Sequence, residues 1–284
     1  MPEENNHQLL LRNILVALDT SAHSRAALEA AAILASLLEA NIRGVFVQEE
    51  HWTRLSRLPS LTAIHELTGK AYALQQDTLE KEIKNVKQRL QRQLKQISSR
   101  KEIAHSLETV QGKAEEEILK AAQEADLITI GWRGRSYPST KKPGSTARGI
   151  IRNADKPVLV LGKNVRLGKR ISVFYDTGTE AQKGLKLGLI LAEHNDSELS
   201  ILLSPPQDEK ATGERNKEIE KMVDRAAVPV EVTQLRRPDI YSLLYLLNRR
   251  RPGLVVMPND HPFLQGQSLD TMLARLNSPL LLMQ

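Results

Sequence analysis

The sequence predicts an α/β protein of two tandem domains, each built on an open parallel five-stranded sheet flanked by helices. Its 284 residues exceed the roughly 100–200 residues of an ordinary domain, so two domains are expected. Short apolar runs rich in Ile, Leu and Val alternate with segments of helical spacing, the order that gives parallel sheets with right-handed crossovers. The pattern starts again near residue 170, which indicates a duplication.

The first half contains five strand patterns and four helix patterns. Residues 13–18 form a short apolar run, and Asp-Thr-Ser follows at 19–21, which is typical of a buried strand followed by a polar turn. Residues 25–39 and 81–98 carry apolar residues at helical spacing, and both are expected to be amphipathic helices. The remaining strands are expected at 41–47, 103–110, 127–130 and 157–161, and the remaining helices at 112–124 and 145–153.

Residues 48–70 do not fit this alternation, and we interpret 48–100 as a helical insertion in the first domain. The segment could form a lid or a contact surface, or pack an extra helix on the core, and the sequence leaves these alternatives open. Its apolar residues are Trp52, Leu55, Leu58 and Leu61.

The second half follows a basic, glycine-bearing connector at 162–169. Residues 171–177 repeat the opening strand with its terminal Asp-Thr, and we place the domain limits at 1–165 and 166–284. Further strands are expected at 199–203, 230–235, 254–257 and 280–283, and helices at 183–193, 217–225, 240–248 and 268–276.

Composition argues against several classes of protein. No stretch approaches the ~18 consecutive apolar residues of a membrane span, and the first eight residues have no apolar signal core, so a cytoplasmic protein is expected. Without cysteine, there is no disulfide or thiol nucleophile. The net charge of +6 is scattered and aromatic residues are only 4%, so nucleic-acid binding is not expected.

The most informative motif follows the fourth predicted strand and has the spacing Gly-x2-Gly-x9-Gly-Ser, through Gly131, Gly134, Gly144 and Ser145. Glycines let a backbone approach a phosphate, and N–H groups at a helix N-terminus face bound anions. Ligands of open parallel sheets bind beyond the carboxyl ends of the strands, so the motif predicts a phosphate-binding loop rather than a plain turn. Four cations nearby suit a polyphosphate or are solvated surface charges: Arg133, Arg135, Lys141 and Lys142.

These segments resemble the universal stress protein family across nearly all of both halves, most specifically at 14–21, 126–134, 144–146 and 155–160. The resemblance implies a Rossmann-like fold, an ATP-binding first domain and a stress-response role as a regulator or sensor. In the ATP-binding branch, the acid that ends the first strand and a backbone position late in the second strand hold the adenosine, while the glycine motif holds the ribose and phosphates. The implied contacts to ATP, alone or with Mg²⁺, are Ala17, Asp19, Thr20, Val47, Ile130, Gly131, Arg133, Gly134, Gly144, Ser145 and Thr146.

Asp19 has two interpretations. It contacts the nucleotide, or it caps the following helix through Thr20 and Ser21. Its repeat Asp176 stands in a half whose loop is altered, so helix capping is the expected role there.

The second half departs from the phosphate-loop motif. Aligning 126–131 with 253–258 puts Pro258 in the place of Gly131, and proline has no N–H group and a fixed φ. His261 replaces the second glycine, the loop is shorter, and Gly266 is followed by Gln267. The second domain is therefore expected to serve as a pairing partner or to carry another ligand.

Signatures of common catalytic sites are absent. The seven histidines form no pair at metal-ligand spacing, and no Walker, kinase or nucleophile-elbow motif occurs. Asp19 is the only evident carboxylate that could act on the metal side, so binding is favoured over catalysis. Weak ATP hydrolysis is left open.

The leading hypothesis is a tandem stress-response protein that binds ATP in its first domain and regulates an unknown protein partner or its own assembly. Residues 158–161 and 280–283 are apolar runs that would be unpaired edges, and we expect them to pair within one chain. A further homodimer is left open. The alternatives are a nucleotide-independent interaction protein that works through 48–100, and a slow ATPase.

Overall fold

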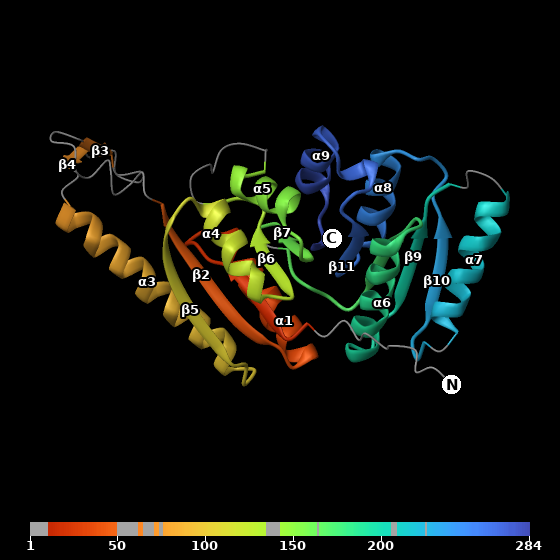
Figure 1. Ribbon diagram of the computed structural model, residues 1–284, viewed down its shortest axis with the longest axis horizontal. Helices are drawn as coiled ribbons and strands as arrows, with labels where there is room; N and C mark the ends of the chain where they lie inside the picture. Colours follow the sequence, from red (N-terminus) through yellow and green to blue (C-terminus); the bar gives the residue numbers. More distant parts are fainter. Residues whose placement is uncertain are drawn as a thin grey trace.

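The computed structural model describes residues 11–49, 62–64, 71–73, 76–134, 143–163, 165–205, 209–224 and 226–284. A continuous ten-stranded sheet runs through both halves (Figure 1) in the order β10-β9-β8-β11-β12-β7-β6-β1-β2-β5. Each half contributes five parallel strands in the same relative order. The predicted α/β class is therefore confirmed, and the two five-stranded units are joined into one sheet.

The large-sheet strands of the first half lie at or near their predicted places, with β5 two residues later than the expected 103–110. Ile14, Leu15 and Val16 are fully buried, because helices cover both faces of a parallel sheet and leave no polar side. The five strands are β1 (Asn13–Ala17), β2 (Asn41–Glu49), β5 (His105–Gly112), β6 (Leu127–Gly131) and β7 (Val158–Leu161).

The second half repeats this arrangement after the connector. Its strands are β8 (Ile171–Tyr175), β9 (Leu199–Leu203), β10 (Val230–Gln234), β11 (Leu254–Pro258) and β12 (Leu280–Met283). β8 lies between β9 and β11, as β1 lies between β2 and β6. The repeat seen in the sequence is therefore a repeat of the sheet.

The two halves meet at the pair β7 and β12, which is antiparallel. Leu281 lies opposite Leu159, and Leu282 lies opposite Val158. This confirms the expected pairing within one chain, which covers two apolar edges that would otherwise be exposed.

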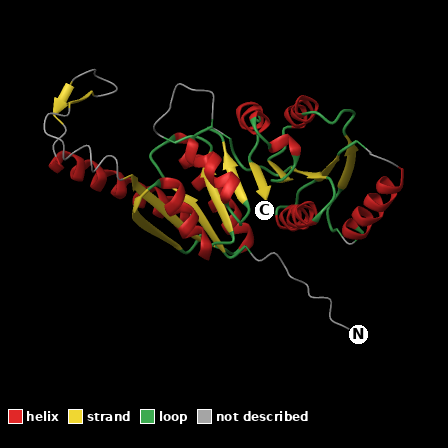
Figure 2. Ribbon diagram, turned by 45° about the horizontal axis from the view of Figure 1, so that its top comes forward, coloured by secondary structure: helices red, strands yellow, loops and turns green. Residues whose placement is uncertain are grey.

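Eight helices of the described residues cover the sheet in two layers, visible in Figure 2. Residues of one layer share a core cluster with one face of the sheet, and residues of the other layer share a second cluster with the opposite face. The first layer is α1 (Ala22–Leu38), α3 (Gln76–Ser99), α6 (Thr179–His194) and α7 (Glu209–Val223), and the second is α4 (Ala114–Ala121), α5 (Ser145–Asn153), α8 (Ile240–Arg250) and α9 (Gln267–Arg275).

Several helix boundaries differ from the sequence expectation. α7 begins at Glu209, eight residues before the expected start at 217. The sequence pattern did not predict this part of the helix, because its residues are mostly polar and show no apolar spacing. α1 begins at Ala22 because Ser21 caps it. Two short 3-10 turns, η1 (Ala122–Glu124) and η2 (Pro262–Leu264), precede β6 and α9.

The segment after β2 contains two short strands rather than an extra helix in its described part. β3 (Thr62–Ile64) pairs antiparallel with β4 (Ala71–Ala73), and this ribbon lies beyond the N-terminal end of α3, away from the large sheet (Figure 1). α3 itself connects β2 to β5, as α7 connects β9 to β10. Trp52, Leu55, Leu58 and Leu61 lie outside the described residues.

In the described part of the chain, no helix combines the length and the apolar character that crossing a membrane requires.

Candidate functional site

The turn between β1 and α1 is fixed by side-chain hydrogen bonds. Ser21 is the N-cap of α1, and its Oγ accepts a hydrogen bond from the Ser24 N–H at 3.1 Å. The Asp19 N–H donates to the buried Ser24 Oγ at 2.9 Å, and the Ser21 N–H donates to Asp19 Oδ1 at 2.8 Å. Asp19 therefore uses one carboxylate oxygen to hold the turn that precedes the helix, while Ser21 is the residue that caps α1.

Gly134 and Gly144 lie opposite this turn. A Cβ built on Gly134 would be 3.2 Å from Asp19 Oδ2, and one on Gly144 would be 3.7 Å from the Gly134 nitrogen. The Gly144 N–H donates to the Trp132 carbonyl at 2.9 Å. The two ends of the glycine loop are thus held together, and the second oxygen of Asp19 lies beside Gly134.

α5 begins at Ser145, and its N-cap residue is Gly144, which has no side chain that could accept a hydrogen bond from the first turn. The first N–H groups of a helix have no partner inside the helix, and they carry the positive end of its dipole. Ser145 is exposed and Thr146 is half-buried. This end of α5 can therefore offer N–H groups and hydroxyls to an anion.

Gly131 has a packing role as well as its place in the motif. A Cβ at this position would lie 2.7 Å from the His23 carbonyl carbon and 2.9 Å from the Ser24 nitrogen. The first turn of α1 therefore rests directly on the end of β6, and a larger residue would push the helix away.

Trp132 anchors the loop through its ring. The Arg133 guanidinium lies 4.1 Å from the ring centroid, a cation–π contact, and the His23 ring meets it edge-on at 5.9 Å. Burial and the positive charge of Arg133 lower the pKa of His23, and burial also lowers the pKa of Arg133. The Ser21 hydroxyl donates to the Arg133 carbonyl at 3.5 Å, so the loop and the β1–α1 turn are linked.

The other predicted contact residues lie on the same side of the sheet. Ala17 and Val47 are half-buried near the ends of β1 and β2, and they pack against the core under α4 and α5. Ile130 is buried in β6, and Thr20 is half-buried in the turn. Arg135, Lys141 and Lys142 lie outside the described residues.

The arrangement places these residues at the switch point of the sheet. The crossover from β1 leads to β2 on one side, while β6 lies on the other, and ligands of open α/β sheets bind in the crevice at such a point. The structure brings Asp19, Gly131, Gly134 and the start of α5 together here, and it places Val47 one strand further along.

The sequence analysis missed two parts of this site, His23 and Trp132. Their contact depends on α1 resting on β6, which no spacing in the sequence reveals. The hydrogen bond of Ser24 could have been predicted from the sequence, because a serine three residues after the N-cap serine can accept a hydrogen bond from the preceding turn.

The register of the strands identifies the counterparts of the site in the second half. β1 and β8 pair with their neighbours in the same way, starting from Ile14 in one and Ile171 in the other. Counting along the strands makes Phe174 the counterpart of Ala17, Asp176 that of Asp19 and Ser204 that of Val47.

Side chains fill the same edge in the second half. The fully buried Phe174 ring contacts the His261 ring at 4.7 Å, and the Phe263 ring lies 4.5 Å from His261. His261 Nδ1 accepts a hydrogen bond from the Phe263 N–H, and its Nε2 lies 3.5 Å from Asp176 Oδ2. The expectation that Asp176 caps a helix is corrected, because its described side-chain contact is with His261, and α6 begins at Thr179 after the N-cap residue Gly178 without a side-chain cap.

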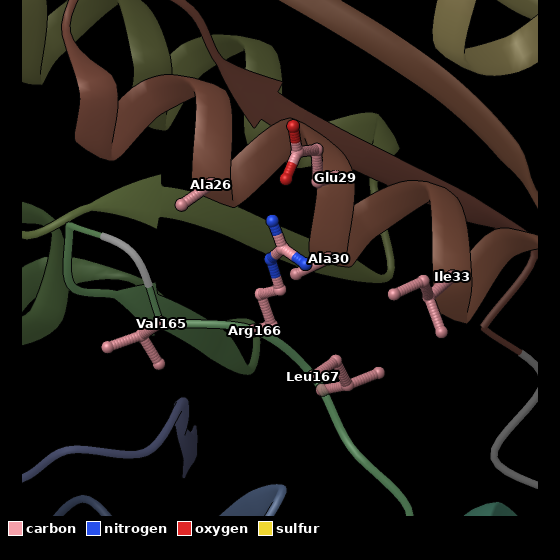
Figure 3. Close-up of a pocket in the computed structure, with 7 residues that line it drawn as sticks. All are labelled: Ala26, Glu29, Ala30, Ile33, Val165, Arg166 and Leu167. Atoms are coloured by element: carbon pink, nitrogen blue, oxygen red, sulfur yellow. The ribbon is translucent and has the colours of Figure 1, made fainter.

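A separate pocket of about 310 Å³ lies where the connector between the halves crosses the middle of α1. Figure 3 shows Arg166 directed from the connector into the space beside Glu29 and Ala30. Apolar side chains form most of its remaining wall. This pocket is one or more helical turns from Ser21 and does not belong to the glycine loop.

Comparison with known proteins gives the family. The sequence profile of the universal stress protein family matches residues 11–162, which is more than half of the chain. The chain belongs to the universal stress protein family. A search among curated proteins found no match.

Solved structures extend the similarity of this universal stress protein to both halves. A universal stress protein from Archaeoglobus fulgidus gives a TM-score of 0.70 at 17% identity, covering 96% of this chain and 98% of that chain. A functionally unknown protein from Pseudomonas aeruginosa gives 0.62 at 12% identity, covering 97% and 93%. The cytoplasmic domain of a prokaryotic cation chloride cotransporter gives 0.53 at 12% identity, covering 95% and 94%.

At these identities the similarity of structure shows the fold alone, whereas the family match supports a role in the stress response. The profile ends at residue 162, and the fold match continues through the second half. The universal stress protein is therefore tandem in form, with its family motif in the first half.

Proposed function

We propose that this universal stress protein binds an adenine nucleotide, ATP, in its first half and uses the occupancy of that site to regulate a protein partner or its own assembly during stress. The observation that carries the proposal is the start of α5, which has no side-chain cap and lies with Gly134 beside the Asp19 carboxylate. A helix N-terminus at a switch point favours the phosphates of a nucleotide.

The residues at this edge fit such a ligand. Gly134 carries no side chain where the loop passes Asp19, and Gly144 carries none where the loop returns to Gly134, so the backbone can approach phosphate oxygens. Ser145 and Thr146 would hold phosphates through their N–H and hydroxyl groups. Ala17 and Val47 would give the adenosine an apolar surface, and Asp19 would contact the adenosine or a Mg²⁺ ion carried by the phosphates.

The proposed role is binding rather than turnover. Phosphoryl transfer needs a group that orients the attacking nucleophile and carboxylates that fix a metal. At this edge Asp19 supplies one carboxylate, and its Oδ1 already accepts the Ser21 N–H. The unknown protein partner, a further homodimer and the cytoplasmic location stay predictions.

The test is the ATP affinity of the intact protein beside Gly144→Asp. Asp is a favourable N-cap residue, and a Cβ at this position meets its neighbours at an ordinary 3.7 Å, so the variant is expected to fold. Its carboxylate would stand where the phosphates are proposed to bind. We expect the affinity to fall by at least ~10-fold, about 1.4 kcal/mol.

Gln267→Asp is the matched control, because Gln267 starts α9 as Ser145 starts α5. It adds the same charge at the corresponding helix of the second half, and we expect it to leave the ATP affinity unchanged. Equal affinity of Gly144→Asp and the unmodified protein, or no binding by either, would contradict the proposal. Thermal unfolding of all three proteins shows whether a loss of binding is a loss of fold.

A further inference from the structure

The second half contains a buried arginine with an unusual hydrogen-bonding pattern. Arg215 of α7 is only 6% exposed, and its Nη1 donates to the Ser204 carbonyl at 3.0 Å. Its Nε and Nη2 are buried and have no hydrogen-bond partner among the described residues. Charged donors that are left unpaired in a protein interior are unfavourable unless another group satisfies them.

The two unpaired nitrogens of Arg215 form one edge of the guanidinium group. Nε–H and Nη2–H point the same way in the plane of the group, which is the side-on fork that accepts the two oxygens of a carboxylate or phosphate. The Ser204 carbonyl occupies only the other side of the group. The geometry therefore leaves a bidentate oxyanion-binding edge without an acceptor.

The acid on the same face of α7 is already engaged. Both carboxylate oxygens of Glu218 accept hydrogen bonds, one from the Tyr175 hydroxyl and one from the Gln182 amide. Burial and the bond to Glu218 raise the pKa of Tyr175, so its hydroxyl remains a donor at neutral pH. Glu218 is thus tied to Tyr175 and Gln182, and no ion pair joins it to Arg215 within the described residues.

The site lies at the same strand ends as the candidate site of the first half, but on the opposite face of the sheet. Ser204 is the strand counterpart of Val47, and Tyr175 immediately precedes Asp176, the counterpart of Asp19. Arg215 therefore lies at the carboxyl ends of β8 and β9 on the α7 side of the sheet, whereas the proposed adenosine surface of the first half lies on the α4 and α5 side. Phe174, His261 and Phe263 fill the neighbouring part of this edge.

We propose that the second half binds one small oxyanion, an inorganic phosphate or a single carboxylate group, on the Nε and Nη2 edge of Arg215. The site differs in chemistry from the proposed nucleotide site, because a buried guanidinium replaces the glycine loop and helix N-terminus. A tandem chain with both sites would bind two different ligands, one in each half of a continuous sheet. The oxyanion proposal does not depend on ATP binding in the first half.

The experiment titrates inorganic phosphate, and separately acetate, into the full chain carrying Gly144→Asp, which disables the proposed phosphate loop of the first half. Ionic strength is held constant with chloride, and calorimetry and the thermal midpoint are both measured. We expect saturable binding at one site and a midpoint that rises with the bound anion. Arg215→Lys should weaken the binding at least ~10-fold, because lysine keeps the charge but loses the fork.

Arg236→Lys is the matched control, since Arg236 is an exposed arginine of the same half, and it should leave the binding unchanged. Saturation by phosphate alone would identify a phosphate site, and saturation by acetate as well would identify a carboxylate site. Saturable binding that survives Arg215→Lys, or no saturation by either anion, overturns the proposal. If Arg215→Lys does not fold, the Nε–H resonance of Arg215 in the parent protein must shift with the same midpoint as the calorimetry.

Discussion

The two halves of this protein have the same strand order, but different residues line the carboxyl ends of their strands. In the first half, Ala17 ends β1 and glycines follow β6, so the edge is lined by small residues, hydrogen-bonded turns and a helix start without a side-chain cap. In the second half, Phe174 stands in place of Ala17, and His261 and Phe263 occupy the loop after β11. A duplicated fold can therefore keep its core while a few side chains of larger volume fill the strand ends of one copy.

The turns after β1 and β8 also differ, because the serines that form hydrogen bonds in the first turn have no equivalent in the second. Ser21 and Ser24 bind the first turn of α1 and the Asp19 backbone, whereas their positions in the second half are taken by Gly178 and Ala181. Asp19 is held toward the glycine loop, and Asp176 is held against His261. The same acid at the same strand end thus acquires a different neighbour from each loop.

Phe174→Ala tests the largest difference between the halves. Phe174 is fully buried, so we expect the free energy of unfolding to fall by ~3–5 kcal/mol through lost burial and a cavity. Chemical denaturation followed by circular dichroism measures it. The reciprocal change, Ala17→Phe, should cost less stability because Ala17 is only half-buried, while ATP affinity should fall. Equal destabilisation by both changes would mean that the two edges are filled alike.

Gly131→Ala tests whether the first motif glycine is needed for packing. The added methyl group would lie within 3 Å of the α1 backbone, and overpacking of this kind costs ~1–3 kcal/mol. Gly144→Ser, in the same loop, adds a side chain where neighbours are 3.7 Å away and should change stability by less than ~0.5 kcal/mol. If the two variants unfold at the same denaturant concentration, α1 does not rest on Gly131 as described.

The pH dependence of unfolding gives the smallest expected effect. The pKa of His23 is lowered by burial and by Arg133, so the unfolded chain binds the proton more readily than the folded chain. Neutral His23 therefore contributes to the free energy of unfolding at pH values above the ordinary histidine pKa of about 6.5, and this contribution is lost as the pH falls below that value. Measured without nucleotide between pH 7.5 and 5.5, His23→Gln should flatten this loss, and an unchanged slope would assign the loss to other groups.

Much of the fold could be read from the sequence because buried parallel strands are continuous apolar runs. The expected strands at 199–203 and 280–283 match β9 and β12. The sequence did not predict the first turns of α7, where the residues are mostly polar. It also did not predict that β3 and β4 pair within the segment interpreted as an insertion. Helix and strand boundaries depend on caps and pairing, which apolar spacing does not encode.

The candidate site was only partly readable from the sequence. The glycine spacing located the loop and the helix start, because those residue types have a direct backbone role. The sequence did not show that Gly131 lies against the α1 backbone, or that the Trp132 ring joins His23 to Arg133. Those contacts join segments more than a hundred residues apart.

The sequence by itself determined the two-fold repeat, the α/β class, the pairing of the last strands and the different glycine content of the two loops. These features follow from local composition and from the period of apolar residues. Only the tertiary structure decided which acid faces a glycine loop and which faces a histidine, and that two buried donors of Arg215 have no partner among the described residues. The reason is physical: burial and hydrogen bonding depend on which side chains of distant segments are brought to the same strand ends.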